Sequence, residues 1–170
     1  GLEMQSSFNG VMSTVALDPL NAAEIACDFF KEKGHKKVKV LYSEMPVYKF
    51  RMQLFADMWS DYGKVECSQS IELQEIEDPN IAYYITSDTN FNVLAKEYRE
   101  KYGKKLVDER CILSVDGKSQ LLPDFEPINS ITVDWKTMGE IVYEECMRRV
   151  NNPGTRSRRI YQNCFLKLHN

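Results

Sequence analysis

The stretch PINSITVDWKTMG, residues 127–139, is the most informative part of this chain. Its first half, Ile128–Val133, reads as a β-strand, and its second half has the apolar spacing of an amphipathic helix. Asp134 and Trp135 stand where the two halves meet. The stretch therefore predicts a strand that leads directly into a helix, with an acidic and an aromatic side chain at the end of the strand.

The same alternation of strand and helix extends outward through most of the chain. Asp18 and Asp88 are predicted to cap helices that Gly34 and Gly103 end. Alternating elements of this kind indicate an α/β fold, a doubly wound parallel sheet with helices on both faces. Strands are predicted at residues 11–17, 38–41, 65–70, 81–86, 111–115, 128–133 and 160–168, with helices after most of them.

Composition excludes several classes of protein. A chain of 170 residues with 43% hydrophobic residues fits one domain with a core, and its net charge of −3 gives no bulk attraction to nucleic acid or membrane. No apolar run is long enough to span a bilayer, and the first residues lack the features of a signal peptide. The five cysteines are odd in number and widely spaced, which indicates reduced thiols in a cytoplasmic protein.

Signals for catalysis are lacking in the sequence. The chain contains no nucleophile elbow, no P-loop and no GxGxxG after a strand. It has two histidines, and no cluster of Cys, His, Asp or Glu has the spacing of a zinc site. We therefore expect a protein that is not an enzyme and that needs neither a metal nor another cofactor.

Residues just after the predicted strands are the candidates for ligand binding, because ligands bind at the carboxyl ends of parallel strands. Arg51 could grip hydroxyls or a carboxylate, or it could be a solvated surface residue. Asp116 could accept two hydroxyl hydrogen bonds, or it could serve only the Asp116-Gly117 turn. Trp135 could be a platform for the apolar face of a sugar or a base, or it could fill the core.

Two further groups of polar residues have a structural alternative. Ser87 and Thr89 offer hydroxyls at another strand end, whereas Asp88 between them is better explained as the helix cap. The arginines at 148, 149, 156, 158 and 159 straddle a turn without interleaved aromatic residues. We interpret them as a solvated surface and not as a nucleic-acid site.

Several segments resemble the effector-binding domain of the lactose/galactose-repressor-like (LacI/GalR) regulators. Residues 127–139 resemble the family signature P-L/I-T-T-V/I-x-Q-D-x-x-x-L/M-G, and residues 33–38 (KGHKKV) resemble x-G-H-R/K-x-V/I. Residues 51–55 resemble R-x-x-G-F/Y, with Leu54 in place of the glycine. Residues 85–88 resemble a strand that ends in N-D, and residues 114–117 resemble G-F/Y-D-D/N.

The resemblance implies a function and a set of site residues. It implies a domain of two lobes like those of the type I periplasmic binding proteins, which binds a small sugar-like effector in its cleft and acts on DNA through a separate upstream head. By position, Arg51, Asp116, Trp135, Ser87 and Thr89 would contact the effector. The helix over residues 90–102 would contribute to a homodimer interface through Phe91, Leu94 and Tyr98.

The resemblance also implies how the chain is divided. Residues 1–170 would be a fragment of the effector-binding domain, with its C-terminal lobe at about 15–128 and 155–170. The helix at about 134–150 would pack on an N-terminal lobe that lies upstream. Residues 71–80, between two predicted parallel strands, are fewer than the dozen or so that a parallel crossover needs. Either this crossover is trimmed, or residues are missing from the chain.

Other functions stay open on the residues alone. A flavodoxin-like or nucleotide-processing α/β enzyme would need a phosphate-binding loop or a poised acid–base pair at a strand end. A periplasmic sugar-binding receptor has a similar fold, and the free cysteines and the missing signal peptide count against it. The favoured hypothesis is the small-molecule-sensing, dimerising domain of a transcriptional regulator.

Overall fold

A computed structural model describes residues 12–73, 76, 78–117 and 126–169. Its main sheet is six-stranded, in the order β3-β2-β4-β5-β6-β8. These strands are β2 (Lys37–Leu41), β3 (Lys64–Ser68), β4 (Ile81–Ile85), β5 (Ile112–Val115), β6 (Ser130–Thr132) and β8 (Phe165–Lys167). All neighbours pair in parallel except β6 and β8. The predicted α/β class with a doubly wound parallel sheet is confirmed.

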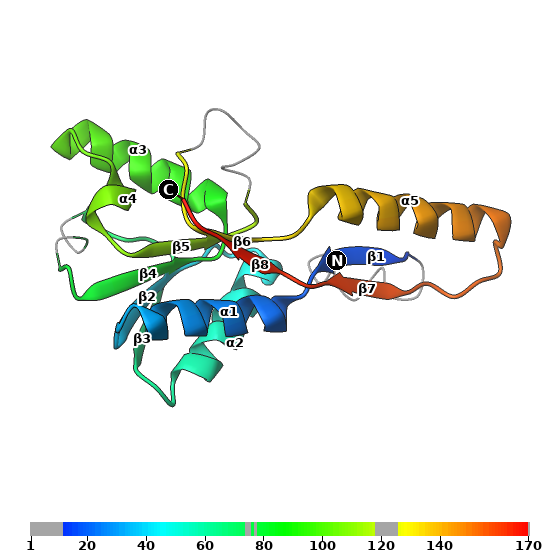
Figure 1. Ribbon diagram of the computed structural model, residues 1–170, viewed down its shortest axis with the longest axis horizontal. Helices are drawn as coiled ribbons and strands as arrows, with labels where there is room; N and C mark the ends of the chain where they lie inside the picture. The colour runs from blue at the N-terminus through cyan, green and yellow to red at the C-terminus, as the bar shows by residue number, and fades with distance from the viewer. Residues whose placement is uncertain (1–11, 74–75, 77, 118–125, 170) are drawn as a thin grey trace.

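Helices cover both faces of this sheet (Figure 1). On one face lie α1 (Pro19–Glu32) and α2 (Pro46–Trp59), and on the other lie α3 (Asp88–Tyr102) and the short α4 (Leu106–Glu109). Asp18 caps α1 as predicted, by accepting from the backbone N–H of Leu20 and Asn21. The predicted cap of α3 was wrong by one residue. Ser87 is the N-cap, and Asp88 is the first residue of the helix.

The core consists of two clusters, one on each side of the sheet. Tyr83 and Tyr84 are adjacent in β4 and therefore point to opposite faces. Tyr84 packs with the cluster under α1 and α2, where its ring lies 4.5 Å from that of Phe55. Tyr83 packs with the cluster under α3. β4 and β5 both contribute residues to the two clusters, which is why these strands are mostly apolar, with the buried Ser114 as the polar residue of β5.

The crossover from β3 to β4 is short. The two strands flank β2 on opposite sides, and the described residues between them contain no α-helix. Lys37 pairs with Lys64 and Lys39 with Glu66 on one face of β2 and β3, while Val38 on the other face packs under α1 and α2. Polar residues therefore occupy the face that lacks a helix. Strands that are buried on both faces are apolar at every position. The alternation of polar and apolar residues in β2 and β3 is therefore the sequence signal that one face has no helix over it.

Three elements form a separate small unit beside this main body (Figure 1). It consists of β1 (Thr14–Leu17), β7 (Arg159–Gln162) and α5 (Trp135–Asn151), and β1 and β7 pair in parallel. The chain crosses between the main body and the small unit at residues 17–19, 132–135 and 162–165. We call these three segments the crossings.

The small unit corrects two sequence-based expectations. One strand was predicted over residues 160–168, but β7 and β8 belong to different sheets. The strand is interrupted because the N–H of Cys164 donates to the side chain of Asn21 at 2.8 Å instead of to a neighbouring strand. β1 also lies in the small sheet, outside the main body to which residues 15–128 were assigned.

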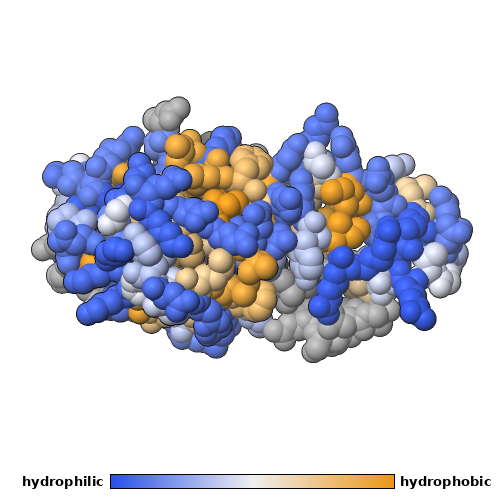
Figure 2. Space-filling view, turned by 60° about the horizontal axis from the view of Figure 1, so that its bottom comes forward, coloured by the Kyte–Doolittle hydropathy of each residue, from blue (hydrophilic) through white to orange (hydrophobic). Residues whose placement is uncertain are grey.

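Apolar side chains remain at the surface of the small unit. Met12, Val15, Val142 and Val150 contribute to a hollow of about 350 Å³ between β1 and α5. Figure 2 shows hydrophobic residues on the face of this unit that is turned to the viewer, at the right of the picture. Among the described residues of α5, Glu145 is the one with a buried side chain. No helix of the described residues is long and apolar enough to cross a membrane.

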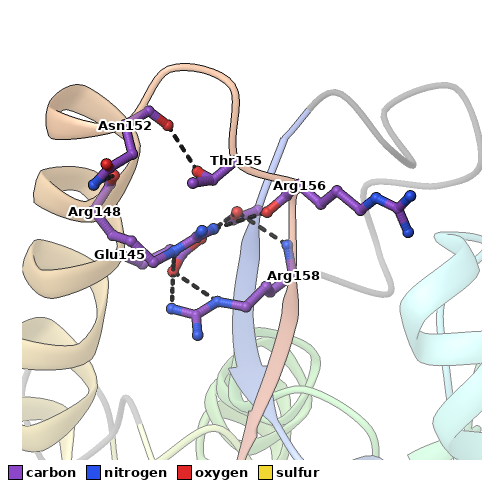
Figure 3. A network of polar contacts seen from close by, with 7 residues as sticks. Glu145, Arg148, Asn152, Thr155, Arg156 and Arg158 are labelled. Carbon is purple, nitrogen blue, oxygen red and sulfur yellow. Dashed lines mark hydrogen bonds and ion pairs between the residues drawn. The ribbon is translucent and has the colours of Figure 1, made fainter.

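Glu145 is the centre of a polar network that holds the small unit together (Figure 3). Its carboxylate accepts from Arg148 of the same helix and from Arg158 just before β7. Ser13, just before β1, also donates to Glu145, and the Ser13 hydroxyl accepts from the backbone N–H of Arg158. Arg148 further donates to the carbonyl of Arg156 at 2.8 Å. One buried carboxylate thus joins the helix to the starts of both strands.

We expect the Glu145 network to make the stability of the protein depend on pH. Hydrogen bonds from Arg148, Arg158 and Ser13 hold the pKa of Glu145 well below its ordinary value of 4.5. A depressed pKa means that this stabilisation is present above about pH 4.5 and is lost as the pH falls further. Glu145→Gln should therefore lower the free energy of unfolding at pH 7, and its difference from the wild type should shrink toward pH 3. Denaturant unfolding at several pH values, with the exposed Glu140→Gln as control, measures this; a difference that does not vary with pH contradicts it.

The polar face of β3 gives a second prediction. Lys64 and Glu66 are exposed on an edge strand, where charged residues oppose pairing with other chains. The double variant Lys64→Leu with Glu66→Leu should self-associate at concentrations at which the wild type does not, because it creates an apolar edge.

Sedimentation velocity over a concentration series measures this association. The control is Glu24→Leu with Lys31→Leu, which places the same two changes on the exposed side of α1. Equal association of both double variants would show that added hydrophobicity, and not the strand edge, is responsible.

Candidate functional site

The carboxyl ends of β2, β4, β5 and β6 lie at one edge of the main sheet. These strands are neighbours in that region, in the order β2-β4-β5-β6, and all run in the same direction. The residues that follow them include Thr86 and Ser87 after β4 and Asp116 after β5. Ligands of open parallel sheets bind at this edge, so the chemistry of these residues decides what the site can hold.

A buried ion pair between Arg51 and Asp116 lies at the centre of this edge. Arg51 is in the second turn of α2, and its Nη1 donates to Oδ1 of Asp116 at 2.8 Å. The same nitrogen donates to the carbonyl of Thr86 at 2.8 Å, which ties the pair to the end of β4. The side chains are 4% and 9% exposed. The structure therefore brings together the two residues that the sequence predicted, and it excludes a solvated Arg51.

The backbone at Asp116 is unusual. Its φ is 104°, and it is the one non-glycine residue with a positive φ among those that the structure describes. Such a conformation costs about 1–3 kcal/mol and persists where surrounding contacts determine it. The N–H of Asp116 donates to the carbonyl of Ile131 at 3.0 Å, and its own carbonyl accepts from the hydroxyl of Thr132 at 3.1 Å. Both backbone groups of Asp116 are thus held by β6.

A second buried carboxylate, that of Asp88, links the start of α3 to β5 and β6. Its Oδ1 accepts from the hydroxyl of Ser114, which lies 2.8 Å from the hydroxyl of Ser130. These side chains come from α3, β5 and β6, and all three residues are fully buried. The chain of hydroxyls and carboxylate therefore fixes the start of α3 against the strands. It does not face solvent, so we assign it a structural role.

The remaining predicted site residues lie in different environments. Ser87 is fully buried, and its hydroxyl accepts from the N–H of Thr89 as the cap of α3. Thr89 is exposed. Trp135 is the first residue of α5 and is 38% exposed at the second crossing, so it does not fill a core. Within the described residues its ring makes no cation–π contact with Arg51, which lies over the ring of Tyr48 instead.

The residues predicted for a dimer interface face the interior instead. Phe91, Leu94 and Tyr98 are at most 6% exposed and pack in the core cluster under α3. Their spacing is that of an amphipathic helix, and the sheet takes up this apolar side. The outward side of α3 carries Val93, which is 58% exposed, together with Lys96 and Glu97. Any contact of α3 with a second copy would therefore involve the outward residues.

Thiol and metal chemistry find little support among the described residues. Burial raises the pKa of Cys27, Cys111 and Cys164 to about 11, so these thiols are protonated and weakly nucleophilic at neutral pH. All five cysteines are free. No group of three or more metal-ligating side chains is present in the described part of the chain. The site instead offers a donor and an acceptor for hydroxyl groups.

Sequence reasoning did not identify the partners that orient the pair. Nothing in the sequence marks the Thr86 carbonyl, because any residue supplies a carbonyl. Thr132 and Ser130 carry a weak signal, since hydroxyl side chains in a buried strand need hydrogen-bond partners. They lie within the 127–139 stretch, but no role is predicted for them from the sequence.

Breaking the buried pair should destabilise the protein strongly. Arg51→Ala leaves the Asp116 carboxylate buried without its cation, which typically costs about 3–5 kcal/mol. The double variant Arg51→Met with Asp116→Leu should cost less than the sum of the single changes, because no charge remains unpaired. Denaturant unfolding of the wild type, of Arg51→Met, of Asp116→Leu and of the double variant measures the coupling energy of the pair. The exposed Arg156→Ala is the control. Additive single effects contradict a direct pair.

Comparison with known proteins gives no match in sequence. No family model matches the chain, and no curated protein matches it. The comparison therefore rests on solved structures, which share the fold at low sequence identity.

Solved structures of transcriptional regulators match nearly the whole chain. A LacI family regulator from Enterococcus faecalis with bound ribose gives a TM-score of 0.70 at 14% identity, over 97% of this chain and 64% of that chain. The regulator CelR with cellobiose gives 0.67 at 18%, over 92% of this chain and 53% of the other. The trehalose repressor from Escherichia coli gives 0.67 at 15%, over 91% and 64%.

This chain therefore spans roughly half to two-thirds of the length of these structures. The shared part is the main body together with the small unit that the crossings join to it. The chain therefore shares a periplasmic-binding-protein-like α/β fold with these LacI-family transcriptional regulators.

Proposed function

We propose that this chain is the effector-sensing part of a LacI/GalR-like transcriptional regulator and that it binds a small, neutral, polyhydroxylated molecule. The observation that carries the proposal is the buried Arg51–Asp116 pair at the carboxyl ends of the strands. Similar structures are regulators whose solved forms hold ribose or cellobiose. Both the fold and the chemistry of the site favour a sugar-like ligand over a catalytic role.

The Arg51–Asp116 pair suits a neutral ligand because the charges of the two side chains cancel. A carboxylate accepts hydrogen bonds from hydroxyl groups, and a guanidinium donates to hydroxyl oxygens. An anionic ligand would instead meet the Asp116 carboxylate at close range, which costs energy in a buried site. The exposed Trp135 would supply a flat surface for the apolar face of a sugar ring, and the exposed Thr89 a hydroxyl. Ser87 would shape the site by capping α3.

The crossings suggest how binding would be transmitted. They join the main body to the small unit, which we propose is part of the first lobe of a two-lobed domain. Ligand held between the lobes would favour the closed state, because a ligand shifts an equilibrium by its difference in affinity for the two states. Closure would then act on DNA through an upstream head in the cytoplasm. A homodimer would use surfaces other than Phe91, Leu94 and Tyr98.

A receptor for sugar transport is the second candidate. A further similar structure, from Alkaliphilus metalliredigens, is described as a periplasmic binding protein/LacI transcriptional regulator and is complexed with D-xylulofuranose. Both kinds of protein use the same fold, so the binding site alone does not separate them. A regulator requires sequence-specific DNA binding that changes with the sugar, whereas a receptor does not bind DNA.

The full-length protein tests the proposed function. Neutral monosaccharides and disaccharides, including D-ribose, D-xylulose and cellobiose, are screened by thermal shift and then by calorimetry. We expect saturable binding of at least one neutral sugar, with affinity lowered about 10- to 100-fold in Arg51→Ala and Asp116→Ala, since a hydrogen bond to a charged group contributes about 1.5–3 kcal/mol. Arg156→Ala should leave the affinity unchanged.

Two results would contradict the proposal. Absence of binding across the neutral panel would reject the ligand class. Binding that neither Arg51→Ala nor Asp116→Ala weakens would reject the site, even if a sugar is bound elsewhere.

A further inference from the structure

We propose that Thr132 is a positioning residue for the binding site: its hydroxyl holds Asp116 in the strained backbone conformation that directs the carboxylate to Arg51. The proposal rests on the proposed function in so far as the pair binds ligand. Thr132 is the last residue of β6 and is 3% exposed. It therefore does not contact a ligand directly; its hydroxyl donates to the carbonyl of Asp116 at 3.1 Å and lies 3.4 Å from that of Val133, and the shorter bond links it to the binding residue.

The hydrogen bonds around Asp116 leave it little freedom. Its N–H is bonded to Ile131, its carbonyl to the Thr132 hydroxyl at 3.1 Å, and its carboxylate to Arg51 at 2.8 Å. A φ of 104° is unfavourable for a residue with a side chain. The conformation therefore depends on these three contacts together. The Thr132 hydroxyl is the one side chain from β6 among them.

Gly117 shows how closely Thr132 packs against this turn. Its φ is 71°, and a Cβ atom on it would lie 2.4 Å from Oγ1 and 2.6 Å from Cβ of Thr132. Asp116 and Gly117 thus form two consecutive positive-φ residues, and Thr132 lies directly against the second. A side chain at Gly117 would displace Thr132 from the Asp116 carbonyl. Both the hydroxyl and the volume of Thr132 fit this turn.

Removal of the hydroxyl would leave the Asp116 carbonyl buried without that partner. Loss of this hydrogen bond weakens the hold of β6 on the strained residue, so the turn would relax toward a backbone conformation that is ordinary for aspartate. The carboxylate would then move relative to Arg51. Thr132 also lies two residues before Asp134, whose carbonyl accepts from Nε2 of Gln162 at 3.2 Å across two crossings. The residue that positions Asp116 is thus beside the segments that would move on closure.

The first test needs no ligand. Nitrogen-detected NMR of the full-length protein follows rotation of the Arg51 guanidinium about its Cζ–Nε bond, which a tight ion pair slows. Thr132→Val, which keeps the shape and removes the hydroxyl, should speed this rotation at least fivefold. Thr132→Ser keeps the hydroxyl and should stay within twofold of the wild type. Asp116→Asn is the positive control, and Thr14→Val in β1 is the matched negative control.

Thr132→Ala serves as a second hydroxyl-free variant if Thr132→Val does not fold. Equal rotation rates in the wild type and in the folded hydroxyl-free variant overturn the proposal. A similar increase in Thr132→Ser also overturns it, because packing and not the hydroxyl would then be responsible.

The second test uses the neutral sugar found in the binding screen. Thr132→Val should weaken the affinity for this sugar about tenfold, whereas Thr132→Ser should keep most of the wild-type affinity. In an Asp116→Asn background, Thr132→Val should cause no further loss of affinity. Losses that multiply in the double variant would show that Thr132 acts independently of Asp116. If no neutral sugar binds, the proposed function fails, while the ligand-free NMR result still decides the role of Thr132.

Discussion

A parallel sheet has to be covered on both faces, and most of this structure follows from that constraint. Where helices cover both faces, in β4 and β5, the strands are mostly apolar, and Tyr83 and Tyr84 pack in different core clusters. Where one face lacks a helix, in β2 and β3, lysine and glutamate occupy that face. Because the strands are parallel, their carboxyl ends also meet at one edge, and this places residues from distant parts of the sequence around a single site.

The site itself depends on the removal of two charges from water. Neither Arg51 nor Asp116 would be stable alone at its depth, so each requires the other, and the Thr86 carbonyl and the Asp116 backbone contacts complete the arrangement. A pair that is neutral as a whole but rich in donors and acceptors is suited to hydroxyl groups. The strained φ of Asp116 fits this view, since backbone strain concentrates where surrounding contacts hold a functional side chain in place.

The small unit is stabilised in a different way from the main body. Its apolar residues are largely exposed, and the buried Glu145 with Arg148, Arg158 and Ser13 provides much of its cohesion. The main body has two large clusters and does not need such a network. Three crossings connect the two parts, and hydrogen bonds of Asp18, Gln162 and Asn21 link the crossings to one another.

The sequence by itself determined the α/β class, the capped ends of the first helix, the place of Arg51 in the helix after β2 and the strand-end position of Asp116, because periodicity, caps and strand ends are local properties. The alternation of polar and apolar residues in KVKVL and KVECS is a further local signal, which marks the face without a helix. Only the tertiary structure decided that Arg51 meets Asp116, that Thr132 holds it, and that Phe91, Leu94 and Tyr98 face the core. It also decided that residues 160–168 divide between two sheets. Each of these depends on which segments become neighbours, and pairing between distant segments is set by the packing of the whole chain.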